Sequence, residues 1–302
     1  MMKLQKQYNN KIIPDIQSEE IKDRITQNLA LCTHAEISAL VNAVNFKHHH
    51  GISQKINRDN ILFESVDIIR YIMAIMNVWE IEPEEFEDAF NKKDAYLWMQ
   101  QNMDSRAWNG EPVVIVDIDD VIASFRESFA SWLEEEYSVK MNVESKEYYF
   151  ITALTDSGLN PELVFENFMA QGGFSNLPIV SGARSFLNYL KSEGYWVQFL
   201  TARPKEDLRC LFDTHSWISK NKLPYDRIDF STEKFRWCAK SEYYDSGAIK
   251  FAIDDSPKHA SEYAKHGINV KVPTMSYNSH IEGENIQFYS SFDDLIRKIK
   301  EE

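Results

Sequence analysis

The chain has 302 residues, of which 43% are hydrophobic and 26% are charged, and both values are ordinary for a globular protein. This length is sufficient for two domains that each have a hydrophobic core. The formal net charge of −14 disfavours a surface that follows a polyphosphate backbone, because such binding requires lysine and arginine to neutralise phosphates. A small phosphorylated molecule that is bound through a metal ion is compatible with this charge.

The three cysteines, Cys32, Cys210 and Cys238, are far apart in the sequence and form no CxxC pair. We expect them to be reduced, buried thiols of a cytoplasmic protein. No apolar run reaches the roughly 18 residues of a membrane helix. The polar first residues also lack the apolar core of a signal peptide.

Residues 18–102 are predicted to form successive helices. Ser18 is a candidate N-cap of the first helix, and Asp59 is a candidate N-cap of a second that continues to about Trp79. Apolar residues lie almost all around this second helix, which predicts that it lies inside a bundle. Pro83 suits the first turn of the last helix.

Three acidic residues of these helices could face one another. Glu64 and Asp67 are three residues apart, so they share a helix face, and Glu36 lies on the preceding helix. Buried carboxylates need partners, so these three form a possible second metal site. The alternative is a bundle whose acids face solvent or pair with Lys47. The adjacent histidines 48–50 would point in different directions on a helix and are not expected to bind metal.

This arrangement resembles the all-α nucleoside triphosphate pyrophosphohydrolases, the MazG and dimeric dUTPase group. In that group, ExxE and ExxD motifs on helices hold Mg²⁺ on a triphosphate. The segment Glu36-Ile-Ser-Ala39 has alanine in place of the second glutamate, whereas Glu64-Ser-Val-Asp67 keeps the second motif. The resemblance implies the group's fold, and the missing acid predicts weak or no hydrolysis of triphosphates. A role in dimerisation or partner binding is the non-enzymatic alternative.

A short polar segment, residues 104–111, contains several turn-forming residues. We place the domain boundary there. Residues 1–105 are then expected to form an all-α bundle, and residues 112–302 a second domain.

The second domain begins with an apolar run, Val113–Val116, that Asp117, Asp119 and Asp120 follow directly. A short run that is apolar throughout is typical of a central strand of a parallel sheet, and ligands bind outside the carboxyl ends of such strands. Asp117 and Asp119 can project to the same side, and they repel each other unless a cation or a shared proton holds them. Mg²⁺ is the expected cation. The alternative is an acidic loop in solvent.

Two later segments repeat this pattern. A predicted strand at 197–200 is followed by Thr201 and Arg203, and another at 251–253 is followed by Asp254 and Asp255. Further strands are predicted at 226–230 and 268–272. Helices of similar length separate these strands, which predicts a parallel sheet with right-handed crossovers.

The chain between about residues 122 and 178 is predicted to leave the sheet. Helices are expected at 122–137, 148–154 and 161–170. A closing helix is expected at 291–300, after the last strand.

The order of Asp117, Thr201, Lys234 and the acid pair at 254–255 resembles the four motifs of the haloacid dehalogenase (HAD) superfamily of phosphatases. The resemblance implies an α/β Rossmann-like HAD domain. It also implies that residues 122–178 are a helical cap, which suits a small substrate because a lid excludes water.

The resemblance assigns the acids to catalysis and to Mg²⁺. Asp117 would attack phosphorus and form an aspartyl phosphate. Asp119 would protonate the leaving group and then activate water. Mg²⁺ would bind Asp117, Asp254 and the backbone carbonyl of Asp119, with Asp255 in support.

The remaining residues would contact phosphate. Thr201 would bind the phosphoryl oxygens and Lys234 would neutralise their charge. Lys250 is a weaker candidate, because its side chain should start at the wrong end of the sheet. Arg203 and Asp120 are candidate substrate-binding residues, although Arg203 could instead pair with an acid of the cap.

Two segments resemble the 5′(3′)-deoxyribonucleotidases: residues 117–125, in which apolar residues and Phe125 follow the acids, and the pair Tyr277-Asn278. The resemblance implies a Mg²⁺-dependent phosphomonoesterase of a (deoxy)nucleoside 5′-monophosphate. A polynucleotide 3′-phosphatase is the alternative, which the cap and the negative charge disfavour. A bifunctional pyrophosphohydrolase and nucleotidase is another.

Overall fold

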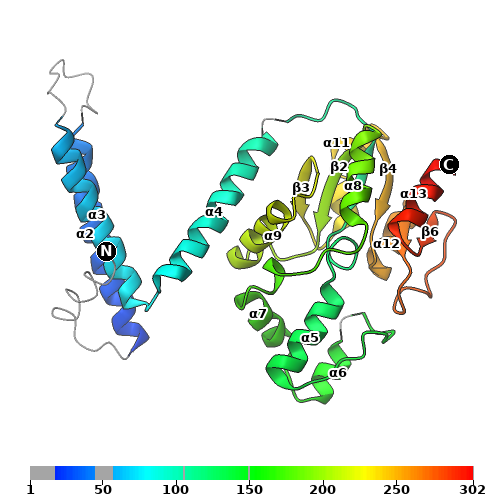
Figure 1. Cartoon of the computed structure of the whole chain (residues 1–302), viewed down its shortest axis with the longest axis horizontal. Helices are drawn as coiled ribbons and strands as arrows, with labels where there is room; N and C mark the ends of the chain where they lie inside the picture. The colour runs from blue at the N-terminus through cyan, green and yellow to red at the C-terminus, as the bar shows by residue number, and fades with distance from the viewer. Residues whose placement is uncertain (1–17, 45–56, 105, 149, 302) are drawn as a thin grey trace. The chain divides into compact units, whose positions relative to one another are not determined.

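The structure is a computed structural model that describes residues 18–44, 57–104, 106–148 and 150–301 (Figure 1). The chain divides by its internal contacts into two compact units, residues 1–91 and 92–302. This division falls inside helix α4 (Pro83–Asp104). Lys47 and the histidines 48–50 lie outside the described residues.

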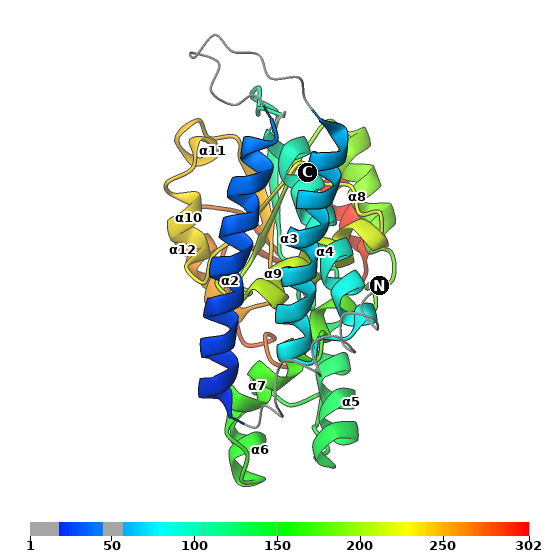
Figure 2. The same cartoon turned by 90° about the vertical axis from the view of Figure 1, so that its left-hand side faces the viewer.

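The first unit contains α2 (Glu19–Asn42) and α3 (Arg58–Val78), which lie side by side in opposite directions (Figure 2). Ser18 caps α2 as predicted, because its hydroxyl accepts a hydrogen bond from the amide of Ile21. The prediction that Asp59 caps α3 is wrong. Asn57 is the N-cap, and its side chain accepts from the amide of Asp59 at 2.9 Å. Asp59 instead occupies the first turn, where the helix dipole favours an acid.

Helix α3 is buried only near its carboxyl end, at Met73, Ala74, Met76 and Val78. Most of its earlier apolar side chains are exposed, so the prediction that the whole helix lies inside a bundle is wrong for this single chain. The physical reason is that α2 covers only one side of α3. The exposed apolar residues of this helix are Leu62, Phe63, Val66, Ile69 and Ile72.

The second unit is built on a six-stranded sheet in the order β3-β2-β1-β4-β5-β6, in which all neighbours are parallel. The strands are β1 (Val113–Val116), β2 (Trp196–Thr201), β3 (Arg227–Phe230), β4 (Ile249–Ile253), β5 (Val270–Pro273) and β6 (Ile286–Tyr289). The predicted parallel sheet is confirmed. Strand β6 was not predicted, and its residues are mostly half-buried at the edge of the sheet.

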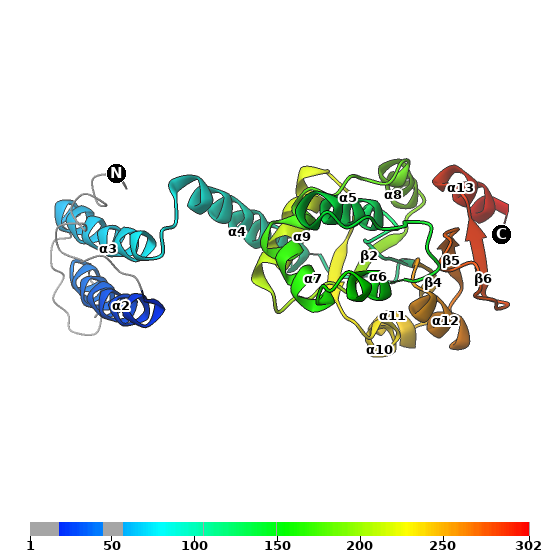
Figure 3. The same cartoon turned by 90° about the horizontal axis from the view of Figure 1, so that it is seen from below.

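Helices cover both faces of this sheet, which gives the predicted Rossmann-like architecture (Figure 3). Val114 and Val116 face one hydrophobic core, while Val113 and Ile115 face the other, because side chains alternate along a strand. The first face carries α8 (Ala183–Ser192), α9 (Leu208–Lys220) and α13 (Phe292–Glu301). The second face carries α10 (Lys234–Cys238), α11 (Glu242–Asp245) and α12 (Pro257–Lys265).

A helical segment between β1 and α8 contains α5 (Phe125–Tyr137), α6 (Ile151–Asp156), α7 (Pro161–Ala170) and the short helix η2 (Gly173–Ser175). Two backbone hydrogen bonds join its ends, from Ser124 N to Pro178 O and from Val180 N to Ile122 O. The segment therefore leaves and re-enters the core through one narrow connection. We call residues 125–175 the cap.

Arg126 organises the loop between α5 and α6. Its guanidinium donates hydrogen bonds of 2.7–3.0 Å to four backbone carbonyls, those of Val143, Ser145, Glu147 and Tyr148. Phe150, just before α6, has the left-handed conformation with φ 55°, so α6 begins at Ile151 and not at residue 148 as the sequence predicts.

Buried His215 on α9 should make the protein sensitive to acid. Burial lowers the pKa of His215 to about 4, from an ordinary value of 6.5. Between these values the unfolded chain binds a proton that the folded chain does not. The contribution of His215 to stability is therefore present above pH 6.5 and is lost as the pH falls toward 4.

Lowering the pH from 7 to 4.5 should reduce the free energy of unfolding of the wild type. In His215→Gln this reduction should be smaller by about 2 kcal/mol. Urea unfolding at the two pH values measures this difference. His280→Gln, at an exposed position, is the matched control and should behave like the wild type. Equal acid sensitivity of all three proteins would contradict the prediction.

Candidate active site

A buried lysine joins two carboxylates at the carboxyl edge of the sheet. Asp117 follows β1 and Asp254 follows β4, and these strands are neighbours. The ammonium of Lys234, in the first turn of α10, lies 2.7 Å from a carboxylate oxygen of each. Its side chain is only 1% exposed. Lys250 is exposed on β4, so of the two candidate lysines the structure brings Lys234 to the acids.

The charges in this cluster are strongly coupled. Burial raises the pKa of Asp117 to about 6, against the lowering effect of Lys234. Burial also acts to lower the pKa of Lys234, but Asp117 and Asp254 outweigh it, so that this pKa is raised above its ordinary value. The lysine is therefore held in its charged form between the two acids.

A third buried acid completes the cluster. Asp117, Asp254 and Asp255 each offer an oxygen, and these oxygens lie within 4.8 Å of one another. One oxygen of Asp255 accepts from the hydroxyl of Tyr277 at 2.7 Å, and the other is buried without a hydrogen-bond partner. Burial and the neighbouring acids raise the pKa of Asp255 well above its ordinary value. Three acids with one lysine and an unpartnered buried oxygen fit Mg²⁺, which binds carboxylate oxygens.

The turn that contains Tyr277 and Asn278 fixes Asp255. The side-chain amide of Asn278 donates to the backbone carbonyls of Asp255 and Pro273, at 3.0 and 2.9 Å. Its oxygen accepts from the amide of Met275 at 3.0 Å. The pair noted in the sequence therefore positions an acid that is 22 residues away from Tyr277.

Asp119 does not point its carboxylate into the acid cluster. Instead, Arg203 donates to both of its oxygens, at 2.9 and 2.6 Å. Thr201 is fully buried at the end of β2, and its hydroxyl accepts from the amide of Arg203 at 3.3 Å. The acid that pairs with Arg203 is therefore Asp119, which follows β1, and not an acid of the cap.

Asp120 lies between β1 and the cap and has the left-handed backbone conformation, with φ 54°. Its carboxylate accepts from the amide of Arg126 at 2.8 Å. Burial raises the pKa of Asp120 to about 7. The side chain therefore supports the beginning of α5, although it also lines the cavity described next.

A cavity of about 440 Å³ lies between the acid cluster and the cap. Asp117, Asp119 and Lys234 lie in its wall, and the cap contributes mainly aromatic rings. These rings belong to Phe125, Phe129, Tyr148, Phe150, Phe165 and Phe174. A cavity of this size with a few charged groups is typical of a small-molecule site.

The polar residues of this cavity that sequence reasoning missed include Thr232, Lys258 and His259. His259 is 6% exposed, and one ring nitrogen has no hydrogen-bond partner. Burial lowers the pKa of His259 to about 4. The available signal was its place in the first turn of the helix that follows Asp254 and Asp255.

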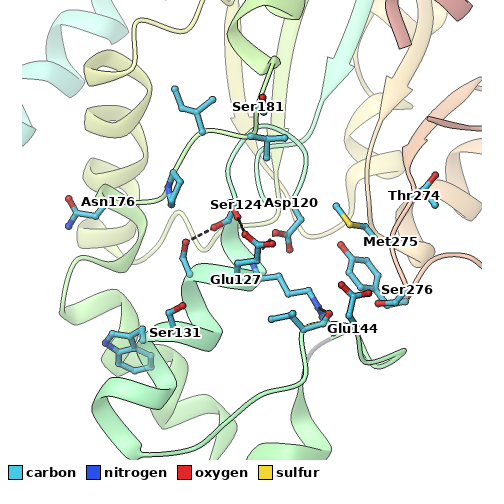
Figure 4. Close-up of a pocket in the computed structure, with 18 of the residues that line it drawn as sticks. Asp120, Ser124, Glu127, Ser131, Glu144, Asn176, Ser181, Thr274, Met275 and Ser276 are labelled. Carbon is cyan, nitrogen blue, oxygen red and sulfur yellow. Dashed lines mark hydrogen bonds between the residues drawn. The ribbon is translucent and has the colours of Figure 1, made fainter. Parts of the chain in front are cut away.

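Figure 4 shows a second cavity, of about 770 Å³, beside the connection between cap and core. Ser124 and Glu127 come from the start of α5, and the segment 274–276 comes from the loop after β5. The hydroxyl of Ser124 donates to Glu127 at 3.2 Å. Asp120 lines both cavities.

The residues of the possible second metal site are not gathered in the same way. Within the ranges that the structure describes, Asp117, Asp254 and Asp255 are the one set of three potential ligands whose atoms approach within 4.8 Å. Glu36, Glu64 and Asp67 form no such set, and Asp67 pairs with Arg70 at 3.5 Å.

The cysteine prediction is partly wrong. Cys210 and Cys238 are buried free thiols, but Cys32 is exposed on α2. No helix in the described segments is long and apolar enough to cross a membrane.

Residues 111–301 match the family model described as 5′ nucleotidase, deoxy (pyrimidine), cytosolic type C protein. This match covers more than half of the chain. The chain belongs to this family. The resemblance to the deoxyribonucleotidases that the sequence motifs predicted is thereby confirmed.

Residues 1–170 match the dUTPase family model, which also covers more than half of the chain. The resemblance of the helical region to the MazG and dUTPase group is thereby confirmed. The two matches overlap on residues 111–170, which form β1 and most of the cap in the structure.

Individual relatives are distant. A Bacillus cereus protein named "Putative nucleotidase" is 26% identical over 114 residues, which are 37% of this chain and 57% of that protein. The match thus spans less than two thirds of the relative. A HAD-superfamily hydrolase from Ehrlichia chaffeensis is 17% identical and covers 65% of this chain and 98% of its own, with a TM-score of 0.38. A D,D-heptose 1,7-bisphosphate phosphatase from Burkholderia thailandensis is 10% identical, covers 64% and 100%, and has a TM-score of 0.40.

The buried position of Lys234 predicts two effects of Lys234→Met. Phosphatase activity should fall at least about 10³-fold, because the charge that we expect to face the phosphoryl group is lost. The free energy of unfolding should also fall, by about 3 kcal/mol, because Asp117 and Asp254 lose a buried partner. Phosphate release and urea unfolding measure the two effects.

Lys250→Met is the matched control, because Lys250 is exposed on β4. Its activity should stay within about twofold of the wild type and its stability within about 0.5 kcal/mol. Loss of activity in the control but not in Lys234→Met would show that the wrong lysine was assigned.

Proposed function

We propose that the protein hydrolyses the phosphate ester of a (deoxy)nucleoside 5′-monophosphate through an aspartyl phosphate on Asp117. The observation that carries this proposal is the buried cluster of Asp117, Lys234 and Asp254 at the wall of an aromatic cavity. Membership of the 5′ nucleotidase family supports the nucleotide as substrate. The apolar and aromatic lining suits a nucleobase, because aromatic rings stack on it.

The first half of the reaction transfers the phosphoryl group. An oxygen of Asp117 attacks phosphorus, the ester bond breaks, and the leaving oxygen takes a proton from Asp119. Lys234 and the hydroxyl of Thr201 stabilise the charge on the phosphoryl oxygens. In the second half, Asp119 accepts a proton from water, which attacks the aspartyl phosphate and releases inorganic phosphate.

The acids Asp117, Asp254 and Asp255, with the backbone carbonyl of Asp119, would hold Mg²⁺. The ion would neutralise negative charge between the nucleophile and the phosphoryl group. Tyr277 supports this arrangement by donating to Asp255. The cap excludes water from the cavity, which protects the aspartyl phosphate from uncontrolled access of solvent.

The decisive variant for this proposal is Asp117→Asn, which keeps the size of the side chain and removes the nucleophile. Activity should fall by at least about 10⁴-fold, because several kcal/mol of the barrier depend on covalent catalysis. Phosphate release is measured on nucleoside monophosphates, sugar phosphates and 3′-phosphorylated oligonucleotides. The proposal requires the nucleoside monophosphates to be the best substrates, and activity of the variant within tenfold of the wild type would disprove the mechanism.

For the helical region we propose a role in assembly, with residues 1–105 as one functional domain and residues 112–302 as the other. The exposed apolar residues of α3 support this proposal, because exposed apolar patches of this extent mark interaction surfaces. A second copy of the chain is the proposed partner, and the family match to dUTPases is compatible with it. Catalysis there is expected to be weak, since Ala39 offers no ligand.

The assembly role can be tested in full-length protein that carries Asp117→Asn, so that the phosphatase is silent. We expect light scattering to give a dimer, which Phe63→Asp together with Ile69→Asp should convert to a monomer. We also expect little release of pyrophosphate from dUTP. Robust release that Glu64→Gln abolishes would instead show that the chain is a bifunctional enzyme.

A further inference from the structure

Arg203 holds the carboxylate of Asp119 by both of its oxygens. Nε donates to one oxygen at 2.9 Å and Nη2 donates to the other at 2.6 Å. The side chain of Arg203 is 1% exposed, whereas that of Asp119 is 24% exposed at the wall of the cavity. This two-point contact fixes the orientation of the carboxylate as well as its position.

Two further contacts fix the guanidinium itself. Its third nitrogen, Nη1, donates to the hydroxyl of Thr214 on α9 at 3.0 Å. Thr214 is fully buried, and its hydroxyl donates to the carbonyl of Cys210 at 2.7 Å. The ring of Phe174, in η2 of the cap, lies 4.1 Å from the guanidinium carbon. Residues of both the core and the cap therefore contact Arg203 and fix the position of its side chain.

The acid cluster explains why Asp119 needs such a partner. Asp119 is only two residues from Asp117, and the group of three buried acids attracts cations. A carboxylate on a short, mobile side chain would be drawn to Lys234 or to a metal ion at this cluster. Arg203 offers a competing positive charge on another side, and Asp119 is absent from the cluster in the structure.

We propose that Arg203 is a positioning residue that keeps the carboxylate of Asp119 out of the metal cluster and aimed at the leaving oxygen of the substrate. This inference rests on the proposed function, in which Asp119 exchanges protons with the leaving group. It differs from a role in binding phosphate, because Arg203 makes a two-point contact with Asp119 and its own side chain is only 1% exposed. The contact with Phe174 links this positioning to the cap.

Substrates with different leaving groups can distinguish positioning of Asp119 from binding of phosphate. The alkoxide of a nucleoside must receive a proton as the ester bond breaks, whereas p-nitrophenolate is stable enough to leave without one. A misplaced Asp119 should therefore slow only the first substrate. The measured quantity is kcat/KM, because it includes only the steps up to departure of the leaving group.

We expect Arg203→Met to lower kcat/KM for a nucleoside 5′-monophosphate by about 100-fold, the usual effect of a general acid. The value for p-nitrophenyl phosphate should change by less than about threefold, and the inhibition constant of inorganic phosphate should not change. Arg203→Lys should give an intermediate loss, because it keeps the charge but not the two-point contact.

Thr214→Val provides a second measurement that does not depend on the fold of the arginine variants. It keeps the shape of the side chain, removes the acceptor of Nη1, and lies outside the residues that line the cavity. We expect the same selective loss on the nucleotide, of about fivefold.

Three results would overturn the inference. Equal losses on both substrates with a weaker inhibition by phosphate would mean that Arg203 binds phosphate. Equal losses with unchanged inhibition would mean a general structural role, and no loss would mean no role. The proposed function is tested separately, by Asp117→Asn on p-nitrophenyl phosphate, a substrate on which the positioning of Asp119 has little effect.

Discussion

The second unit depends on one buried lysine between two buried acids. Lys234 lies at 2.7 Å from both Asp117 and Asp254, and all three side chains are buried. Two carboxylates that are buried together are unstable without compensation, since burial and mutual repulsion both oppose their charge. The lysine supplies part of that compensation, and the unpartnered oxygen of Asp255 leaves room for a divalent cation. The excess of negative charge in this cluster thus creates the capacity to bind a metal ion.

The cap forms the other wall of the site, and its construction is mostly apolar. Aromatic rings of α5, α7 and η2 pack against one another. For example, the rings of Phe125 and Phe174 are stacked, with 5.8 Å between their centroids. Hydrogen bonds of two polar residues also stabilise it. The guanidinium of Arg126 donates to four backbone carbonyls, and the carboxylate of Asp120 accepts from the amide of Arg126 at the start of α5. A narrow backbone connection then joins cap and core, so that both walls of the cavity keep a defined geometry.

The helical unit shows the opposite situation, because its apolar surface exceeds what a pair of helices can bury. Helix α3 is covered along one side and near its carboxyl end, where Trp79 donates to Thr26 of α2 at 2.8 Å. The remaining apolar residues of α3 are exposed to solvent, and only a further partner could bury them. The acids of this unit are half-exposed and partly paired with arginine, which separates them physically from the dense cluster of the second unit.

The sequence alone determined the features that local patterns control. The run Val113–Val116 is apolar at every position, and an acid follows it at once, so both the central strand and the position of Asp117 were predictable. The order of strands, helices and motifs likewise gave the HAD fold, the choice of Lys234 over Lys250, and the cap. Strand β6 was not predicted, because four residues after a polar loop, three of them half-buried and one buried, carry too weak a pattern.

Tertiary structure alone decided which polar groups meet. Arg203 and Asp119 are 84 residues apart, and Tyr277 and Asp255 are 22 apart, so no local pattern connects them. Their contacts depend on the directions in which strand ends and turns project, and those directions follow from the packing of the sheet. The exposure of α3 was also undecided, because an apolar helix has the same sequence pattern whether its partner is in the same chain or in another. A sequence specifies which surfaces must be buried, whereas the folded structure shows which of them one chain can bury by itself.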